Sequence, residues 1–236
     1  MTTYDASVPE LVGTAVLDTI GLVIANVAEP LALELGLKEK ECGSLGLISS
    51  RTGAAGQLLA VDDAVKATNT KIISIELPRD TKGWGGHGNY IVIGAHSVSD
   101  ARRAVEIALE KIEEYAGEVH ISDAGHLEFA YCASAGEVLE QAFGIPRGGA
   151  FGFMAGSPAA IGMVMADRAV KFSQIQVTKY MTPSKGTSHS NEVIIAFTGE
   201  TSAVREAVLT GKRIGFSLLS AMGSAPLSPG KQPYLL

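Results

Sequence analysis

An internal repeat constrains the fold of this chain more than any other feature of its sequence. The segment Val61–Lys66 reads VDDAVK, and Ala166–Lys171 reads ADRAVK about one hundred residues later. Each segment follows a short apolar stretch that contains glycine and precedes a β-branched run. Further matching residues then come in the same order in the two halves: Pro78, Lys82-Gly83, His87 and Asn89, then Pro183, Lys185-Gly186, His189 and Asn191. An ordered series of this kind predicts a duplicated domain.

Hydrophobic patterning predicts the same elements in both halves. Short β-branched runs bounded by glycine and proline are typical of buried strands. We expect such strands at 44–48, 71–75 and 90–93, and again at 150–154, 176–180 and 192–197. Apolar residues three and four positions apart predict a helix over Ser99–Tyr115, with a second over Ser202–Met222. The apolar stripe of the first helix comprises Ala101, Ala104, Val105, Ala108, Leu109 and Ile112.

Weaker signals complete the expected order. The apolar runs at 22–27 and 127–132 lead into helical stretches at 29–37 and 135–143. Each half therefore reads β-α-β-α-β-β-α. The boundary falls near Ala116-Gly117, where a helix ends and glycine suits its C-terminus. We expect an α/β (α+β) fold with two tandem domains, 1–116 and 117–236, each an antiparallel-rich sheet flanked by helices.

Composition and charge argue against several classes of protein. A net charge of −6 makes a basic nucleic-acid-binding face unexpected. Cys42 and Cys132 form no CxxC pair, so they predict neither a disulfide framework nor a zinc site. No apolar run reaches the roughly 18 residues that a membrane-spanning helix needs. We expect no nucleic-acid partner and no membrane partner.

Motifs for catalysis and for cofactor binding are missing from the sequence. The histidines show no HExxH or similar metal-binding spacing. The run Ser188-His189-Ser190 lies in no GxSxG motif, and the glycines at 83–88 do not match a phosphate-binding loop. We therefore expect no catalytic residue, no metal site and no cofactor.

These residues resemble the shell domains of bacterial microcompartments. The run DDAVKATN at Asp62–Asn69 is similar to the helix signature of that family, and a glycine-containing strand precedes it as in the family. In ordinary members the remaining strand and helix come last, whereas the matching segments 22–37 and 127–143 come first here. The chain resembles the tandem, circularly permuted form, and most of all the shell proteins of propanediol-utilisation compartments.

This resemblance implies a structural protein rather than an enzyme. Three chains would form a six-domain, pseudohexameric tile with closed symmetry. Such tiles would join other shell proteins around encapsulated enzymes in the bacterial cytoplasm. Pores in the tile would pass small polar solutes such as 1,2-propanediol or glycerol. An axial metal site, made by symmetry-related copies of one histidine, is an alternative that the sequence leaves open.

The resemblance also implies which residues matter. In shell tiles the loop between the two strands surrounds the pores, and here those loops are 79–88 and 184–190. Their polar groups can replace water around a small alcohol, although taken alone they read as ordinary surface connections. The candidates for the pore lining are Asp80, Lys82, Trp84, His87, Asn89, Lys185, Ser188, His189, Asn191 and Glu192. Lys66 and Lys171, late in the first helix of each half, are expected at the tile edge.

A second class of function remains open from the residues alone. Duplicated α/β domains commonly bind a ligand between their copies, so a small-ligand sensor or an enzyme is the alternative. That class predicts an asymmetric pocket with paired catalytic groups. Both halves instead carry the same Lys-Gly…His-x-Asn loop, which favours symmetry-related pore linings.

Overall fold

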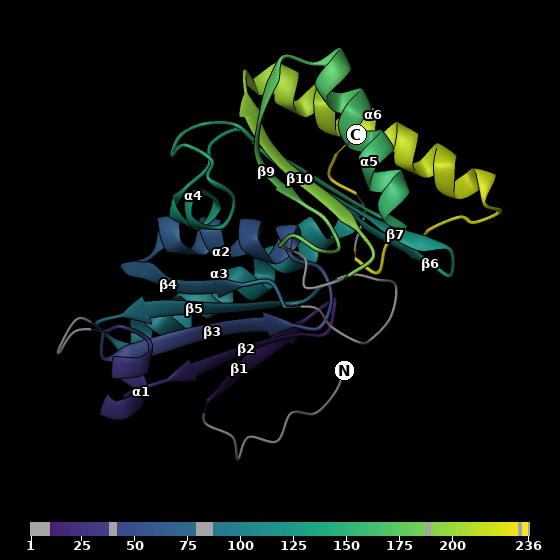
Figure 1. Ribbon diagram of the computed structural model, residues 1–236. Coiled ribbons are helices and arrows are strands. Elements are labelled where there is room, and N and C mark those ends of the chain that lie inside the picture. The colour runs from purple at the N-terminus through teal and green to yellow at the C-terminus, as the bar shows by residue number, and fades with distance from the viewer. Residues whose placement is uncertain (1–9, 38–41, 79–86, 187–189, 231–232, 236) are drawn as a thin grey trace.

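The chain forms two five-stranded antiparallel sheets, one after the other in sequence (Figure 1). The computed structural model describes residues 10–37, 42–78, 87–186, 190–230 and 233–235. The first sheet has the order β1-β2-β3-β5-β4 and the second β6-β7-β8-β10-β9. Their strands are β1 (Leu11–Ala15), β2 (Thr19–Ile24), β3 (Ser44–Ser50), β4 (Thr70–Glu76), β5 (Asn89–Ala95), β6 (Val119–Ser122), β7 (Gly125–Cys132), β8 (Phe151–Ser157), β9 (Ile175–Met181) and β10 (Val193–Gly199).

The helices follow the same plan in both halves. They are α1 (Glu29–Glu34), α2 (Ala55–Ala67), α3 (Val98–Tyr115), α4 (Glu137–Phe143), α5 (Ala159–Phe172) and α6 (Thr201–Ala221), with a short 3-10 turn at Ala116–Glu118. Each half therefore has the order β-β-α-β-α-β-β-α, which confirms the predicted duplication. Among the described residues, no helix has both the length and the apolar content needed to cross a bilayer.

The prediction was wrong about the start of each half, which has one more strand than expected. The missed strands, β1 and β6, contain only five and four residues. A strand that short shows too few alternations to stand out in the sequence. Each missed strand pairs with the next one, β2 or β7, and so lies at the edge of its sheet.

Helix α3 confirms the predicted apolar stripe. All six stripe residues are buried, and they pack against the first sheet and α2. The helix begins after Ser97, whose side chain accepts a hydrogen bond from the amide of Asp100 at 3.1 Å. This is the usual way in which serine satisfies a free N–H group at a helix start.

Two glycines allow α5 to lie directly against the second sheet. A Cβ atom at Gly156 would come within 2.7 Å of the backbone of Gly162, and one at Gly162 within 2.6 Å of the carbonyl oxygen of Val193. Any larger residue at either position would push α5 away from β8 and β10. This close contact places the first turn of α5 beside the start of β10, where Glu192 lies just before the strand.

One apolar cluster extends across both domains. Helix α4 of the second domain rests on α2 of the first (Figure 1). A single cluster of buried side chains contains Leu58 and Val61 from α2 together with Phe143 and Phe151 from the second domain. Ten of the 13 residues of α2 are buried as a result, so this helix is covered on both sides.

Candidate functional site

The ends of the two predicted pore loops meet at the junction of the domains. His87 lies near the end of the first loop, and Glu192 follows the second. The Nδ1 atom of His87 lies 2.6 Å from Oε1 of Glu192, although the residues are 105 positions apart. Asp80, Lys82, Trp84, Ser188 and His189 lie outside the described residues, so the structure places only part of each loop.

Glu192 accepts hydrogen bonds from three directions. Besides His87, Nε2 of His126 lies 3.1 Å from its Oε2 atom. The hydroxyl of Ser190 donates to its Oε1 atom at 2.6 Å. All four side chains are buried, and His126 comes from β7, an inner strand of the second sheet. We refer to His87, His126, Ser190 and Glu192 as the Glu192 cluster.

Electrostatics favour the charged forms in the Glu192 cluster. Burial opposes the charge on Glu192, but the charges and hydrogen bonds of His87 and His126 outweigh it and hold its pKa well below the usual range. Burial likewise opposes the charge on His87, yet the charge and hydrogen bond of Glu192, with the charge of Glu128, raise the pKa of that imidazole. The result is an ionised carboxylate that favours a protonated imidazole beside it.

Asn89 fastens the first loop to the turn between β3 and α2. Its side-chain amide donates to the hydroxyl of Ser50 at 2.7 Å and to the carbonyl of Gly53 at 3.0 Å. Gln57 of α2 donates to the same hydroxyl at 3.3 Å. Within the described part of the chain, Nε2 of His87, Oδ1 of Asn89 and Oε1 of Gln57 are buried without a hydrogen-bond partner.

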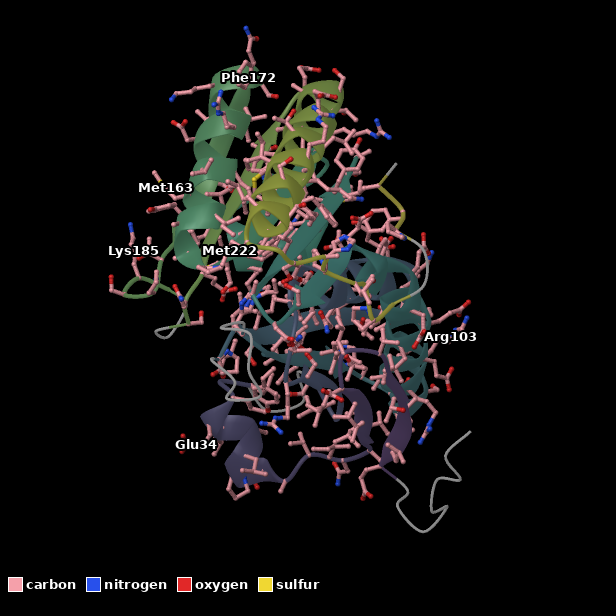
Figure 2. The ribbon with its side chains drawn as sticks, turned by 90° about the vertical axis from the view of Figure 1, so that its right-hand side faces the viewer. Glu34, Arg103, Met163, Phe172, Lys185 and Met222 are labelled. Atoms are coloured by element: carbon pink, nitrogen blue, oxygen red, sulfur yellow. The ribbon has the colours of Figure 1, made fainter. Side chains whose placement is uncertain are left out.

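Lys185 and Asn191 differ from the other placed candidates because both are exposed. Figure 2 shows Lys185 at the outer end of its loop, pointing away from the molecule. Backbone hydrogen bonds of 2.9 Å in both directions join Lys185 to Thr182 and form a tight turn. The Oδ1 atom of Asn191 accepts from the amide of Ala159 at the start of α5. The structure thus separates buried candidates, which hold the loop bases, from exposed ones, which present polar groups to solvent.

The two lysines predicted at the tile edge lie in different surroundings. Lys66 pairs with Asp62 at 2.7 Å and donates to the carbonyl of Ser134 at 2.7 Å, so it takes part in the contact between domains. Lys171 pairs at 2.8 Å with Asp167 of its own helix and is more exposed. Equivalent positions in the repeat therefore meet different neighbours within one chain.

Two carboxylates that the sequence interpretation missed also join the domains. Asp62 of α2 accepts hydrogen bonds from the amides of Gly136 and Val138, at 2.8 and 3.1 Å, where α4 begins. Glu128 of β7 accepts from the amides of Ala54 and Ala55, at 2.9 and 2.6 Å, where α2 begins. Carboxylates are favourable at helix N-termini because free N–H groups point outward there. Asp62 belonged to the repeated motif, but nothing in the sequence showed its partner.

The described residues contain no group of three or more histidine, cysteine, aspartate or glutamate side chains arranged to hold a metal ion. One surface cavity of about 350 Å³ is lined by Cys42, Asn69–Lys71 and Gly94–His96, and another of about 520 Å³ by 14–20 and Pro229. Neither cavity contains the Glu192 cluster.

Comparison with known proteins identifies the family. The family model of the BMC domain, the bacterial microcompartment domain, matches residues 44–123 and 150–225. The chain is 47% identical over 226 residues to the bacterial microcompartment shell protein PduB of Citrobacter freundii, covering 96% of this chain and 83% of that one. It is 42% identical over 224 residues to PduB of Limosilactobacillus reuteri, covering 94% of both chains.

Solved structures agree with this family. The crystal structure of EtuB from Clostridium kluyveri matches with a TM-score of 0.92 and 49% identity, over 95% of this chain and 98% of that one. A trimeric bacterial microcompartment shell protein PduB matches with a TM-score of 0.91 and 41% identity, over 96% of this chain and 100% of that one. The chain belongs to the bacterial microcompartment shell protein family and carries two copies of its domain. The predicted shell role, rather than an enzymatic one, is confirmed by these relatives.

Proposed function

We propose that three copies of this chain form a pseudohexameric shell tile whose pores pass small polar solutes such as 1,2-propanediol or glycerol. The observation that carries the proposal is an exposed apolar face on α5. The equivalent face on α2 is already buried by the other domain of the same chain. A second copy of the chain can cover the α5 face in the same way.

The exposed fractions of equivalent residues make this difference clear. On α2, Leu58 and Leu59 are 0% and 2% exposed. Their repeat equivalents on α5, Met163 and Val164, are 49% and 42% exposed. Figure 2 shows Met163 and Phe172 along the outer side of α5, and Phe172 is also strongly exposed. Apolar groups in such a contiguous stripe commonly mark a protein interface.

The opposite end of the molecule carries the matching surface. Helix α1 lies there, far from α5, as Figure 1 shows. It is the repeat equivalent of α4, since both helices end at a glycine with positive φ, Gly36 at 71° and Gly144 at 70°. Leu31 of α1 is 59% exposed, whereas Leu139 of α4 is fully buried against the first domain. If α1 of one copy covers α5 of the next as α4 covers α2, six equivalent domain contacts close a ring of three chains.

The loops between the paired strands supply the pore lining in this proposal. Asp80, Lys82, Trp84, Ser188 and His189, with the exposed Lys185 and Asn191, offer polar groups to a solute. The buried side chains of His87, Asn89 and Glu192 hold the bases of these loops in place. Amide, hydroxyl and imidazole groups suit small alcohols because they can replace the hydrogen bonds that the alcohol makes with water.

The remaining parts of the proposal concern the assembled shell. Domain limits of 1–116 and 117–236 place the 3-10 turn between the two units. Lys66 and Lys171, at the C-terminal ends of α2 and α5, lie at the outer edge of the tile and meet neighbouring tiles. Other shell proteins and encapsulated enzymes are the further partners.

Light scattering coupled to size exclusion tests the tile directly. The wild-type protein should have the mass of three chains of 24.5 kDa. Met163→Glu should give a monomer, because it places a charge in the apolar face. Arg103→Glu, on the exposed side of α3, changes charge elsewhere and should leave the trimer intact (Figure 2). A monomeric wild type, or a trimeric Met163→Glu variant, would contradict the proposed contact.

A further inference from the structure

We propose that the Glu192 cluster is a proton-controlled tie between the two domains, which is strongest in mildly acidic solution and weakens as the pH rises above neutral. The tie would regulate how firmly the bases of both loops are held. Its meaning for permeation rests on the pore role proposed above. The tie itself is a property of the single chain.

The cluster joins three segments that are far apart in sequence. His87 precedes β5 in the first domain, His126 lies in β7, and Ser190 and Glu192 precede β10 in the second domain. Every member is buried, so water cannot replace a lost contact at low cost. The amide of Gly88, next to His87, donates to the carbonyl of Pro78 at 2.9 Å and closes the base of the first loop. The stability of this base therefore depends on His87.

The repeat shows that the tie is specific to one kind of domain contact. The β-bulge in each sheet aligns Val92 of β5 with Ala196 of β10, so Gly88 in the first half corresponds to Glu192 in the second. Glycine thus stands where the second half has the bridging carboxylate. A contact between two chains, built from the opposite pair of domains, would lack the carboxylate of the Glu192 cluster.

Among the described residues, few other charged groups face the cluster. Glu128 of β7 acts on His87, and its carboxylate is occupied by the amides at the start of α2. Arg51 lies exposed on the loop next to Gly88. The segments of α2, β8 and α5 that pack nearby, 55–61, 151–157 and 159–166, contain no charged residue. Within this part of the chain, Glu192 and His87 therefore dominate the local response to pH.

The direction of the response follows from the two groups with shifted pKa values. The pKa of His87 is raised in the folded chain, so its contribution to stability is complete below its ordinary value of 6.5 and is lost as the pH rises through the raised value. The pKa of Glu192 is lowered, so its contribution is complete above its ordinary value of 4.5 and is lost as the pH falls towards the lowered value. The tie is strongest between these two ordinary values.

Loss of the His87 proton weakens the tie without breaking it. The neutral ring can keep its Nδ1–H donor on Glu192 and release the Nε2 proton, which has no partner among the described residues. What disappears is the positive charge beside a buried carboxylate. The expected change is a graded loosening of the domain contact rather than unfolding.

Hydrogen exchange on the intact protein measures this loosening. Amides of residues 87–92 and 190–195, corrected for the intrinsic effect of pH, should lose protection between pH 6 and pH 8.5. The loss should approach about tenfold for each unit by which the pKa of His87 exceeds 6.5. Glu192→Gln keeps the shape of the side chain but removes its charge, so the loss should disappear. His120→Gln is the matched control, because His120 is a buried histidine beside Glu118 and outside the cluster.

A second measurement covers the case in which the Glu192 variant does not fold. Titration of the labelled His87 imidazole by NMR in the wild-type protein should give a pKa above 6.5. A value at or below 6.5, or equal pH responses in the wild-type and Glu192→Gln proteins, overturns the tie. The solution mass is recorded on the same samples, so a monomer with an intact pH response would reject the tile and keep the tie.

Discussion

Asp62 holds the start of a helix that belongs to the other domain. Its two oxygens accept from two amides at the start of α4, and they also pair with Lys66. The repeat equivalent, Asp167, pairs with Lys171 on the surface of α5. One repeated side chain thus joins two domains in the first half and faces solvent in the second.

We expect Asp62→Ala to lower the free energy of unfolding by about 2–3 kcal/mol, because two buried amides lose a charged acceptor. Urea denaturation should be measured in the Met163→Glu background, where association does not contribute. Asp167→Ala is the control and should have a smaller effect in that background. An equal loss in both variants would show that Asp62 acts mainly through its own helix.

At the level of the elements, residues 225–230 and 233–235 form a strap across the second domain. Leu227 exchanges two backbone hydrogen bonds with Ile121 of the edge strand β6, at 2.9 and 3.0 Å. Further along, the amide of Leu235 donates to the buried carboxylate of Glu118 at 2.7 Å. Lys212 of α6 pairs with the same carboxylate at 2.8 Å and also donates to the carbonyl of Leu235. The strap therefore completes the surroundings of a buried ion pair.

Ending the chain at Ser224 should lower the melting temperature by several degrees. Removal of the strap exposes the edge of β6 and leaves Glu118 with fewer hydrogen bonds, at a cost of about 1–3 kcal/mol. Calorimetry of the truncated and full-length proteins measures the shift. Leu227→Pro, which removes only one amide of the strap, should have a smaller effect in the same direction. An unchanged melting temperature after truncation would mean that the strap contributes no stability.

The sequence predicted elements better than it predicted contacts. The repeat and the apolar periods of α3 and α6 are local signals, so the positions of these helices followed from them directly. His126 carries no such signal, because its contact with Glu192 depends on how β7 and the start of β10 pack across β8. The same holds for Glu128, which meets α2 only when the two domains pack together. Local patterns therefore identified the loops, and tertiary packing decided which of their residues are buried.

At the scale of the whole molecule, α1 and α5 present exposed apolar faces at opposite ends of the fold, and we propose that these faces meet between copies. If they pair between copies, folding and association are coupled. The melting temperature of the wild-type protein should then rise with protein concentration, whereas that of Met163→Glu should not. Differential scanning calorimetry over a hundredfold range of concentration checks this. A concentration-independent wild type would indicate that the exposed faces of α1 and α5 do not meet.

The difference between Glu192 and its repeat equivalent Gly88 has a consequence for the way tiles are arranged in a sheet. Six identical domains would occupy a hexagonal lattice site in six indistinguishable ways. A ring in which contacts with the bridging carboxylate alternate with contacts that lack it looks the same only after a turn of 120°, so each site offers two distinguishable placements. Each tile in such a layer therefore has one of two orientations. Neighbouring tiles with different orientations form a boundary within an otherwise continuous sheet.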